Sequence, residues 1–270
     1  LGQRAPRGVI RGQRKRACRA DGRIPSIDGI RSNRDRHVAK PCIICCTADG
    51  RLSVMRVFYT RITQAESVFA TTAIDRLPPA ARHRVAGMQD RRAQAQTVAG
   101  LLLLRHALAD DACWWRLGRS ATGRPEIAGG PSFSISHSKD RVACAIAGAG
   151  PIGLDIEARR DDVSPRLIAR IATAEHEFFA AWCAREATVK ASGRVGLARV
   201  RAIELGSAHA RLDNADWPLR WLDLAPDYAA CLAVAPDAAA SLEDIICEEI
   251  DGRALVAEEN RARMSANKRE

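Results

Sequence analysis

Three acidic side chains in the middle of the chain have the types and spacing of a magnesium site. Asp155 and Glu157 lie two residues apart in an apolar run, so on a strand both would point to the same face. Glu186 follows in the segment 182–190, which has the pattern of a helix. Three oxygen ligands without a neighbouring His or Cys suit Mg²⁺, which usually keeps coordination positions open for substrate phosphates.

An amine accompanies the third acid. Glu186 and Lys190 are four residues apart and therefore share one face of the helix expected over 174–192. One rigid helix would thus hold an acid and a cation beside the acidic strand. The alternative interpretation is that the strand acids form a solvated face and that the helix pair is an ordinary surface pair.

A third motif reads Phe-Ser-Ile-Ser-His-Ser over residues 133–138 and leads into the apolar strand expected over 142–147. Hydroxyls and an imidazole at a strand end, Ser136 and His137 among them, can donate hydrogen bonds to phosphate oxygens. The motif is not a serine-hydrolase elbow, because Gly-x-Ser-x-Gly is absent. A purely structural histidine is the alternative for His137.

Four motifs in order, at 123–125, 133–138, 153–157 and 182–190, resemble those of the 4'-phosphopantetheinyl transferases, in particular the larger, surfactin-synthetase-activating type. The resemblance extends from Met55 to Asp237. It implies transfer of 4'-phosphopantetheine from coenzyme A to a serine of an acyl or peptidyl carrier protein, with release of adenosine 3',5'-bisphosphate. It also implies an α+β fold, a pseudo-dimer of two similar halves in which a long helix packs on a small, mainly antiparallel sheet.

The resemblance assigns roles to individual residues. Asp155, Glu157 and Glu186 would bind Mg²⁺, Glu186 would also accept the proton of the carrier serine, and Lys190 would stabilise phosphate charge. The contacts to coenzyme A would come from a larger set, namely Arg84, Thr97, Gly123, Arg124, Pro125, Ser136 and His137.

The chain departs from the family pattern at a few positions. Gln96 stands where an arginine is common, and Arg84 is suggested as its replacement from spacing alone. Thr122 replaces an aromatic residue that often precedes the Gly-Lys/Arg-Pro turn. Arg185 replaces a lysine, which keeps the charge but changes its geometry.

The positive charge of the chain is concentrated at one end. The net charge is +10, and residues 1–54 hold 13 Lys or Arg against 4 Asp or Glu. This basic extension is expected to be disordered, with Met55 as a natural chain start, and any nucleic-acid binding would rest on it alone. Nucleic acid is not the expected partner. The cluster Cys42-x-x-Cys45-Cys46 lacks a second ligand pair, so no zinc site is expected there.

Composition fits an enzyme of one or two cores, with 270 residues of which 47% are hydrophobic. No apolar run is long enough to span a membrane, and scattered cysteines favour a reducing cytoplasm. We expect a monomer with a first half at 55–148, a second half with the metal site at 149–240, and a tail at 241–270 that includes a short helix over 243–263.

The expected elements follow from periodicity and from glycine and proline positions. Helices are expected over 77–86, 91–108, 166–171 and 174–192, strands over 57–59, 142–147, 153–157, 200–205, 219–224 and 228–234, and a loop over 122–131.

Two further predictions concern partners and rivals. Four arginines after the acidic strand, Arg159, Arg160, Arg166 and Arg170, could meet an acidic carrier protein, although solvated arginines are the alternative. A Mg²⁺-dependent phosphoesterase would also use clustered acids, and it is the rival enzyme class.

Overall fold

The computed structural model describes residues 54–63, 73–108, 111–148, 150–171, 177–193 and 197–255. The chain divides into two compact units, Leu1–Ala39 and Lys40–Glu270, and every described residue belongs to the second. Residues 1–53 of the expected extension, with their cysteine cluster, lie outside the described residues.

The first sheet has the strand order β11-β1-β5-β4. Its strands are β1 (Met55–Arg61), β4 (Ser132–Ser138), β5 (Arg141–Ala147) and β11 (Ile245–Glu249). Strand β5 is antiparallel to both β1 and β4, whereas β11 runs parallel to β1. Helix α3 (Arg91–Ala107) packs on this sheet through an apolar face, and the side chain of Asp90 caps its first turn by accepting from two backbone N–H groups.

The second sheet has the order β6-β10-β9-β8-β7. Its strands are β6 (Ile152–Ala158), β7 (Glu204–Leu205), β8 (His209–Leu212), β9 (Ala215–Trp221) and β10 (Tyr228–Val234). Helix α6 (Phe178–Ala191) covers one face, with α5 (Pro165–Ile171) and α7 (Leu197–Arg201) beside it.

The remaining elements are short and lie in the connections between these strands and helices. They are η1 (Ile74–Arg76), α2 (Pro79–Ala86), α4 (Asp111–Trp115), the hairpin of β2 (Leu117–Arg119) with β3 (Pro125–Ile127), and η3 (Pro236–Leu242).

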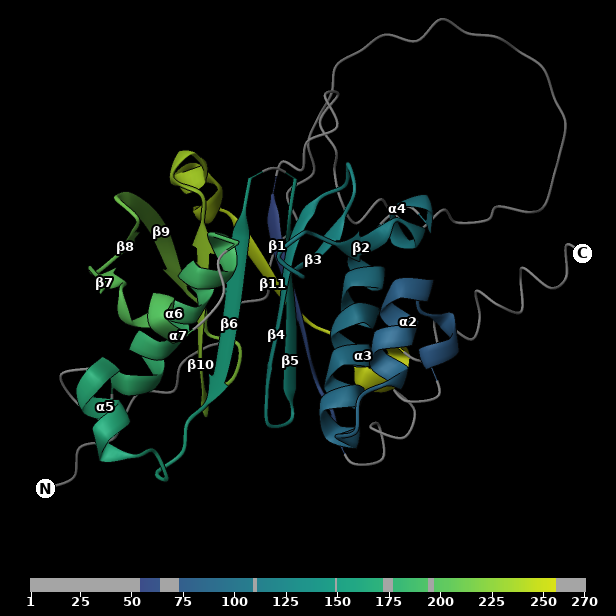
Figure 1. The fold of residues 1–270 in the computed structure, drawn as a ribbon, viewed down its shortest axis with the longest axis horizontal. Helices are drawn as coiled ribbons and strands as arrows, with labels where there is room; N and C mark the ends of the chain where they lie inside the picture. Colours follow the sequence, from purple (N-terminus) through teal and green to yellow (C-terminus); the bar gives the residue numbers. More distant parts are fainter. Residues whose placement is uncertain are drawn as a thin grey trace, which may run out of the picture. The chain divides into compact units, whose positions relative to one another are not determined.

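The two sheets lie between the helices, with α3 and α2 on one side and α6 on the other (Figure 1). A shared apolar core fills the space between the sheets and includes Val57 and Ala145 from the first and Leu154 and Ile156 from the second. Because side chains alternate along a strand, Asp155 and Glu157 project from the opposite face of β6, toward α6. The predicted common face of the two strand acids is therefore confirmed, as is the α+β fold class.

Several expected elements differ from the structure. The motif 133–138 forms almost all of strand β4 rather than a strand end, and Val200 belongs to α7 rather than to a strand. The start of the helix expected over 243–263 is wrong, because Ile245–Glu249 is strand β11. Strand β11 pairs with β1, which lies at the other end of the described sequence. The local pattern of residues 245–249 does not reveal so distant a partner. Among the described residues, no helix combines the length and the apolarity that crossing a bilayer requires.

Close packing of α6 on β6 depends on Gly153. A Cβ atom at this position would lie 2.0 Å from the Ala187 carbonyl oxygen and 2.5 Å from the Ala191 backbone nitrogen. Both are backbone atoms that cannot rotate away, so any larger residue would push the helix off the strand. The glycine of the acidic motif thus sets the distance between the helix and the acids.

We expect Gly153→Ala to lower the free energy of unfolding by about 3 kcal/mol, because overpacking must displace α6. Urea denaturation followed by circular dichroism would measure the loss. Gly118→Ala is a suitable control, since a Cβ there would meet only the Arg116 carbonyl oxygen at 3.9 Å. Equal stability losses in the two variants would contradict this account.

Candidate active site

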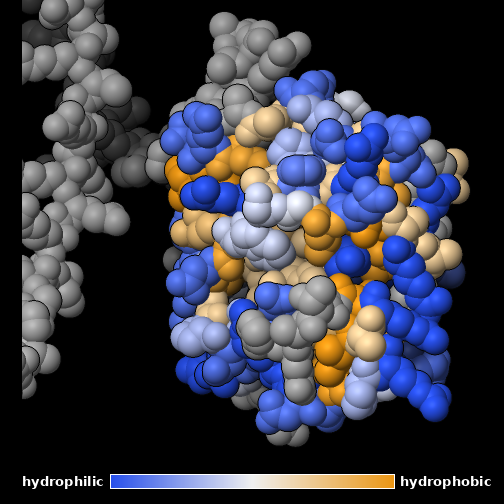
Figure 2. Space-filling model, turned by 90° about the vertical axis from the view of Figure 1, so that its left-hand side faces the viewer, coloured by the Kyte–Doolittle hydropathy of each residue, from blue (hydrophilic) through white to orange (hydrophobic). Residues whose placement is uncertain are grey.

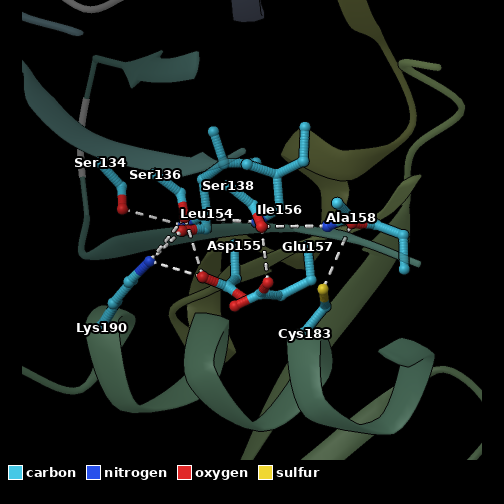
Figure 3. Close-up of polar contacts among 11 residues, drawn as sticks. Ser134, Ser136, Ser138, Leu154, Asp155, Ile156, Glu157, Ala158, Cys183 and Lys190 are labelled. Atoms are coloured by element: carbon cyan, nitrogen blue, oxygen red, sulfur yellow. Dashed lines mark hydrogen bonds and ion pairs between the residues drawn. The ribbon is translucent and has the colours of Figure 1, made fainter. Parts of the chain in front are cut away.

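Strands β4 and β6 lie side by side without a backbone ladder between them, because each belongs to a different sheet. A row of serine hydroxyls from β4 replaces the ladder (Figure 3). The Oγ atoms of Ser134, Ser136 and Ser138 accept hydrogen bonds from the backbone N–H groups of Leu154, Ile156 and Ala158, at 2.9, 3.3 and 3.1 Å respectively. We call these three residues the serine row.

Two members of the serine row also hold the acids. Ser136 Oγ donates to Asp155 Oδ1 at 2.9 Å, and Ser138 Oγ donates to Glu157 Oε2 at 2.7 Å. Both carboxylates lie next to each other on the side of β6 that faces α6 (Figure 3). Asp155 is buried and Glu157 is half-buried, so neither charge is fully solvated.

Lys190 of α6 reaches the same place. Its Nζ donates to Asp155 Oδ1 at 2.7 Å, to the Leu154 carbonyl oxygen at 3.0 Å and to Ser136 Oγ at 3.0 Å. The ammonium group therefore partly neutralises the buried acid. The helix and the strand acids, which were predicted to meet, do meet through this side chain.

Glu186 lies one turn earlier on α6 and is half-buried. Burial and then the charge of Asp155 raise its pKa, Lys190 acts in the opposite sense, and Glu157 raises the pKa further. Burial likewise raises the pKa of Glu157, against the hydrogen bond from Ser138 and together with the charge of Asp155. The charge of Asp155 therefore acts on both Glu157 and Glu186, which places the three predicted metal ligands near one another.

The residues present fit a hard divalent cation by their chemistry. Within the described ranges, no group of three or more His, Cys, Asp or Glu side chains is arranged so that it could hold a metal ion as it stands. Among the described residues, however, buried Asp155 Oδ2 has no hydrogen-bond partner of normal geometry, which is rare for a carboxylate oxygen, although the Cys183 thiol interacts with the same carboxyl group. A cation would give this atom a partner and would offset the repulsion among the acids. The nearby Cys183 thiol donates to the Ala229 carbonyl oxygen at 3.3 Å, and burial holds its pKa well above normal, so it stays a thiol.

A cavity of about 180 Å³ lies between α2, α3 and the β2–β3 hairpin. Four of the residues predicted to contact coenzyme A line it, namely Arg84, Thr97, Pro125 and His137. Arg119 lines it as well, and burial together with the charge of Arg84 lowers the pKa of Arg119. Two guanidinium groups that repel each other across a cavity are typical of an anion site.

His137 is exposed on one side, yet the protein around it desolvates the ring enough to lower its pKa, and Lys190 adds to this effect. The imidazole is therefore neutral at pH 7 and offers one N–H donor to the cavity.

A second cavity of about 260 Å³ adjoins the first and shares Pro125 and Ile135 with it. Gly123 and Arg124 line it from one side and Lys190 from the other. Gly123 turns the chain with a φ of 81°, a conformation that glycine adopts without strain. The two cavities are therefore neighbours, and the second is lined by the lysine that contacts Asp155.

The Arg124 guanidinium group, which borders the second cavity, has a structural role. Its Nη2 donates to the Phe133 carbonyl oxygen at 3.2 Å and to the Ile152 carbonyl oxygen at 2.6 Å. It thereby ties the start of β4 to the start of β6, and burial lowers its pKa.

One predicted residue, Ser136, occupies a different place from that expected, and Gln96 is a departure from the family pattern whose role the structure shows. Ser136 lines neither of these two cavities, because its hydroxyl is engaged by Asp155, Lys190 and the backbone of β6. Gln96 is buried, and its Nε2 donates to the Lys139 carbonyl oxygen at 2.6 Å. Gln96 therefore does not replace the arginine that is common in the phosphopantetheinyl transferases, which the chain resembles, whereas Arg84 lines the first cavity.

Sequence reasoning missed Arg119. In the β2–β3 hairpin this residue lies opposite Pro125, which was predicted to belong to the site. A hairpin reading of residues 117–127 would have placed the arginine next to the Gly-Arg-Pro turn. Residues 122–131 are predicted to be a loop, and β3 within them is the partner strand that brings Arg119 to the cavity.

No model of a known protein family and no curated protein matches the chain. Function is therefore inferred from the side chains and their geometry.

The raised pKa values of Glu157 and Glu186 predict a pH dependence of stability without metal. A carboxyl whose pKa is raised on folding contributes stability below its unfolded pKa, near 4.5, and loses it as the pH rises through the folded value. In EDTA, we expect the Tm to fall more steeply above pH 4.5 for the wild-type chain than for the Glu157→Gln/Glu186→Gln double variant. Parallel Tm profiles would show that these two groups are not perturbed.

The first cavity predicts selective loss of anion binding. Arg84→Gln and Arg119→Gln should each weaken binding of inorganic pyrophosphate by about 10-fold or more, since each removes a charged donor. Isothermal titration calorimetry would measure the affinity. Arg82→Gln is the matched control, because Arg82 lies on the same helix as Arg84 but does not line the cavity. An equal effect of all three variants would contradict a specific anion site.

Proposed function

We propose that the chain is a Mg²⁺-dependent transferase that moves 4'-phosphopantetheine from coenzyme A to a serine of an acyl or peptidyl carrier protein. The observation that carries the proposal is the position of Lys190. This side chain lines the cavity formed by the Gly-Arg-Pro turn and also bonds to Asp155. A cavity suited to phosphates thus ends beside three acids suited to Mg²⁺.

The topology supports the finer proposal of a pseudo-dimer. The first half has the strand order β1-β5-β4 with α3 between β1 and β4 in sequence. The second half has the order β6-β10-β9 with α6 between β6 and β9 in sequence, and all pairs within both triplets are antiparallel. Two halves with the same order and the same strand directions are expected from an internal duplication.

Coenzyme A would bind through its phosphates. Arg84, Arg119 and the neutral His137 would donate to phosphate oxygens in the first cavity, with Thr97 beside them. The turn of Gly123, Arg124 and Pro125 would border the adenine side, and the pyrophosphate would lie toward Lys190. This arrangement uses every predicted coenzyme A contact except Ser136.

The chemical step is a phosphoryl transfer. The carrier serine oxygen forms a bond to the phosphorus that bears pantetheine, and the bond from that phosphorus to the bridging oxygen of the pyrophosphate breaks. Adenosine 3',5'-bisphosphate leaves with the bonding electrons. Such a reaction depends mainly on positioning and on stabilisation of charge. Bound Mg²⁺, held by Asp155, Glu157 and Glu186, would supply charge neutralisation on the pyrophosphate.

Glu186 is the residue proposed to accept the serine proton. Glu186 lies one turn from Lys190 on α6 and close to the strand acids, so it is placed to take the proton directly or through one water. Lys190 would stabilise the negative charge that accumulates on the departing phosphate oxygen. Its flexible side chain can reach from Asp155 into the second cavity, which it already lines.

The carrier protein would approach over the end of β6 and over α5. Arg159, Arg160, Arg166 and Arg170 are all exposed there. Figure 2 shows that hydrophilic residues cover much of this side of the molecule, with smaller apolar areas between them. Arg160 Nη1 also lies 3.5 Å from Glu157 Oε2, so this surface adjoins the proposed metal site. An acidic carrier protein of the cytoplasm is the partner that these charges would attract.

We expect Asp155→Asn and Glu186→Gln to reduce transfer by roughly 100-fold or more, because one removes a metal ligand and the other the general base. Intact-mass analysis of carrier proteins incubated with coenzyme A and Mg²⁺ measures the product directly. Asp216→Asn, an exposed acid on β9, is the control and should keep full activity.

Undiminished transfer in both site variants would refute the proposed roles. Hydrolysis of coenzyme A at the same rate without any carrier protein would instead identify a phosphoesterase.

A further inference from the structure

The three members of the serine row share one task and differ in another. Each hydroxyl accepts a backbone N–H group of β6. Ser138 and Ser136 also donate their single hydroxyl proton to a carboxylate. Ser134 makes no such hydrogen bond to a carboxylate of the described residues. Ser134 and Ser138 can therefore be compared directly, because both bond to the backbone of β6 but only Ser138 also bonds to an acid.

We infer that Ser138 is a positioning residue that orients Glu157 for metal binding, an inference that rests on the proposed function. A serine hydroxyl has one proton and two lone pairs. The Ala158 N–H occupies a lone pair at 3.1 Å, and the proton is directed at Glu157 Oε2 at 2.7 Å. One carboxylate oxygen is thereby fixed, and the other oxygen remains available as a metal ligand.

No other described contact holds Glu157 as firmly. Arg160 Nη1 lies 3.5 Å from the same oxygen, at the limit of a hydrogen bond, and its side chain is 40% exposed. Groups that hydrogen-bond to metal-ligating carboxylates typically change metal affinity by roughly 10–100-fold when they are removed. Ser138 is positioned for this effect, while Ser136 is less suitable as a test because its hydroxyl also contacts Lys190.

The positioning residue and its carboxylate come from different halves of the chain. Ser138 belongs to β4 of the first half, which also contributes the cavity with the two arginines, and Glu157 belongs to β6 of the second. A metal ligand on one half is therefore oriented by the half that would bind coenzyme A. The second half alone would present its acids without this constraint.

The experiment measures Mg²⁺ binding to the full chain by isothermal titration calorimetry, without coenzyme A or carrier protein. Ser138→Ala should weaken Mg²⁺ binding by roughly 10-fold or more, whereas Ser134→Ala, which loses the same kind of bond to β6, should leave Mg²⁺ affinity within about twofold. Thermal unfolding of both variants reports the structural task that they share. In a Glu157→Gln background, Ser138→Ala should cause no further loss, since its effect acts through that carboxylate.

Each outcome decides the inference. Equal Mg²⁺ affinity of Ser138→Ala and wild type, or an equal loss in Ser134→Ala, would overturn it. If Ser138→Ala does not fold, Ser138→Cys keeps the shape with a weaker donor, and wild-type affinity in that variant would overturn the inference. A wild-type chain that binds no Mg²⁺ would overturn both this inference and the proposed metal site, whereas Mg²⁺ binding with the expected variant pattern but no transfer would leave only the proposed function in error.

Discussion

The serine row is the interaction on which the rest of the structure depends. Two sheets meet at β4 and β6, and a strand edge that faces another strand must satisfy its backbone groups. Hydroxyls do this with a short reach, and their spare proton is available for the acids on β6. The same three contacts thus join the two sheets, satisfy backbone groups at the edge of β6 and shape the acidic site. Arg124 and Gly153 complete this constraint, one by tying the strand starts together and the other by admitting α6 closely.

Local patterns predicted the parts of the fold that have local causes. Helix α3 was expected to begin at Arg91, as it does, and β10 was expected over the residues that form it, because apolar periodicity and flanking turns define both. Alternation along β6 placed its two acids on one face. Strand β11 could not be foreseen in this way, since its parallel partner β1 is distant in sequence and the segment 245–249 shows no helix or strand period of its own. Long-range pairing decided its structure.

The candidate site shows the same division. The four-residue spacing of Glu186 and Lys190 predicted that they share one face of a helix, because the pitch of a helix is fixed. The residue types predicted that this face would lie beside the strand acids. The resemblance suggested Ser136 as a phosphate contact, but its hydroxyl is directed at Asp155. The partner of the Ser136 hydroxyl depends on which strand lies against β4. Spacing along the sequence does not predict that this strand is β6. Arg119 was missed for a related reason, because a short hairpin brings it to the first cavity.

The position of β4 has a consequence for biosynthesis. In the first sheet, β4 forms one edge and β1 is covered on its outer side only by β11. A ribosome completes β6 soon after β4, whereas Ile245–Glu249 is synthesised last among the described strands, so the outer edge of β1 stays open during most of the synthesis of these strands. Open edges are templates for pairing with other chains. The nascent protein is therefore most vulnerable to aggregation at β1 before β11 emerges, whereas β6 can cover the β4 edge through the serine row much earlier.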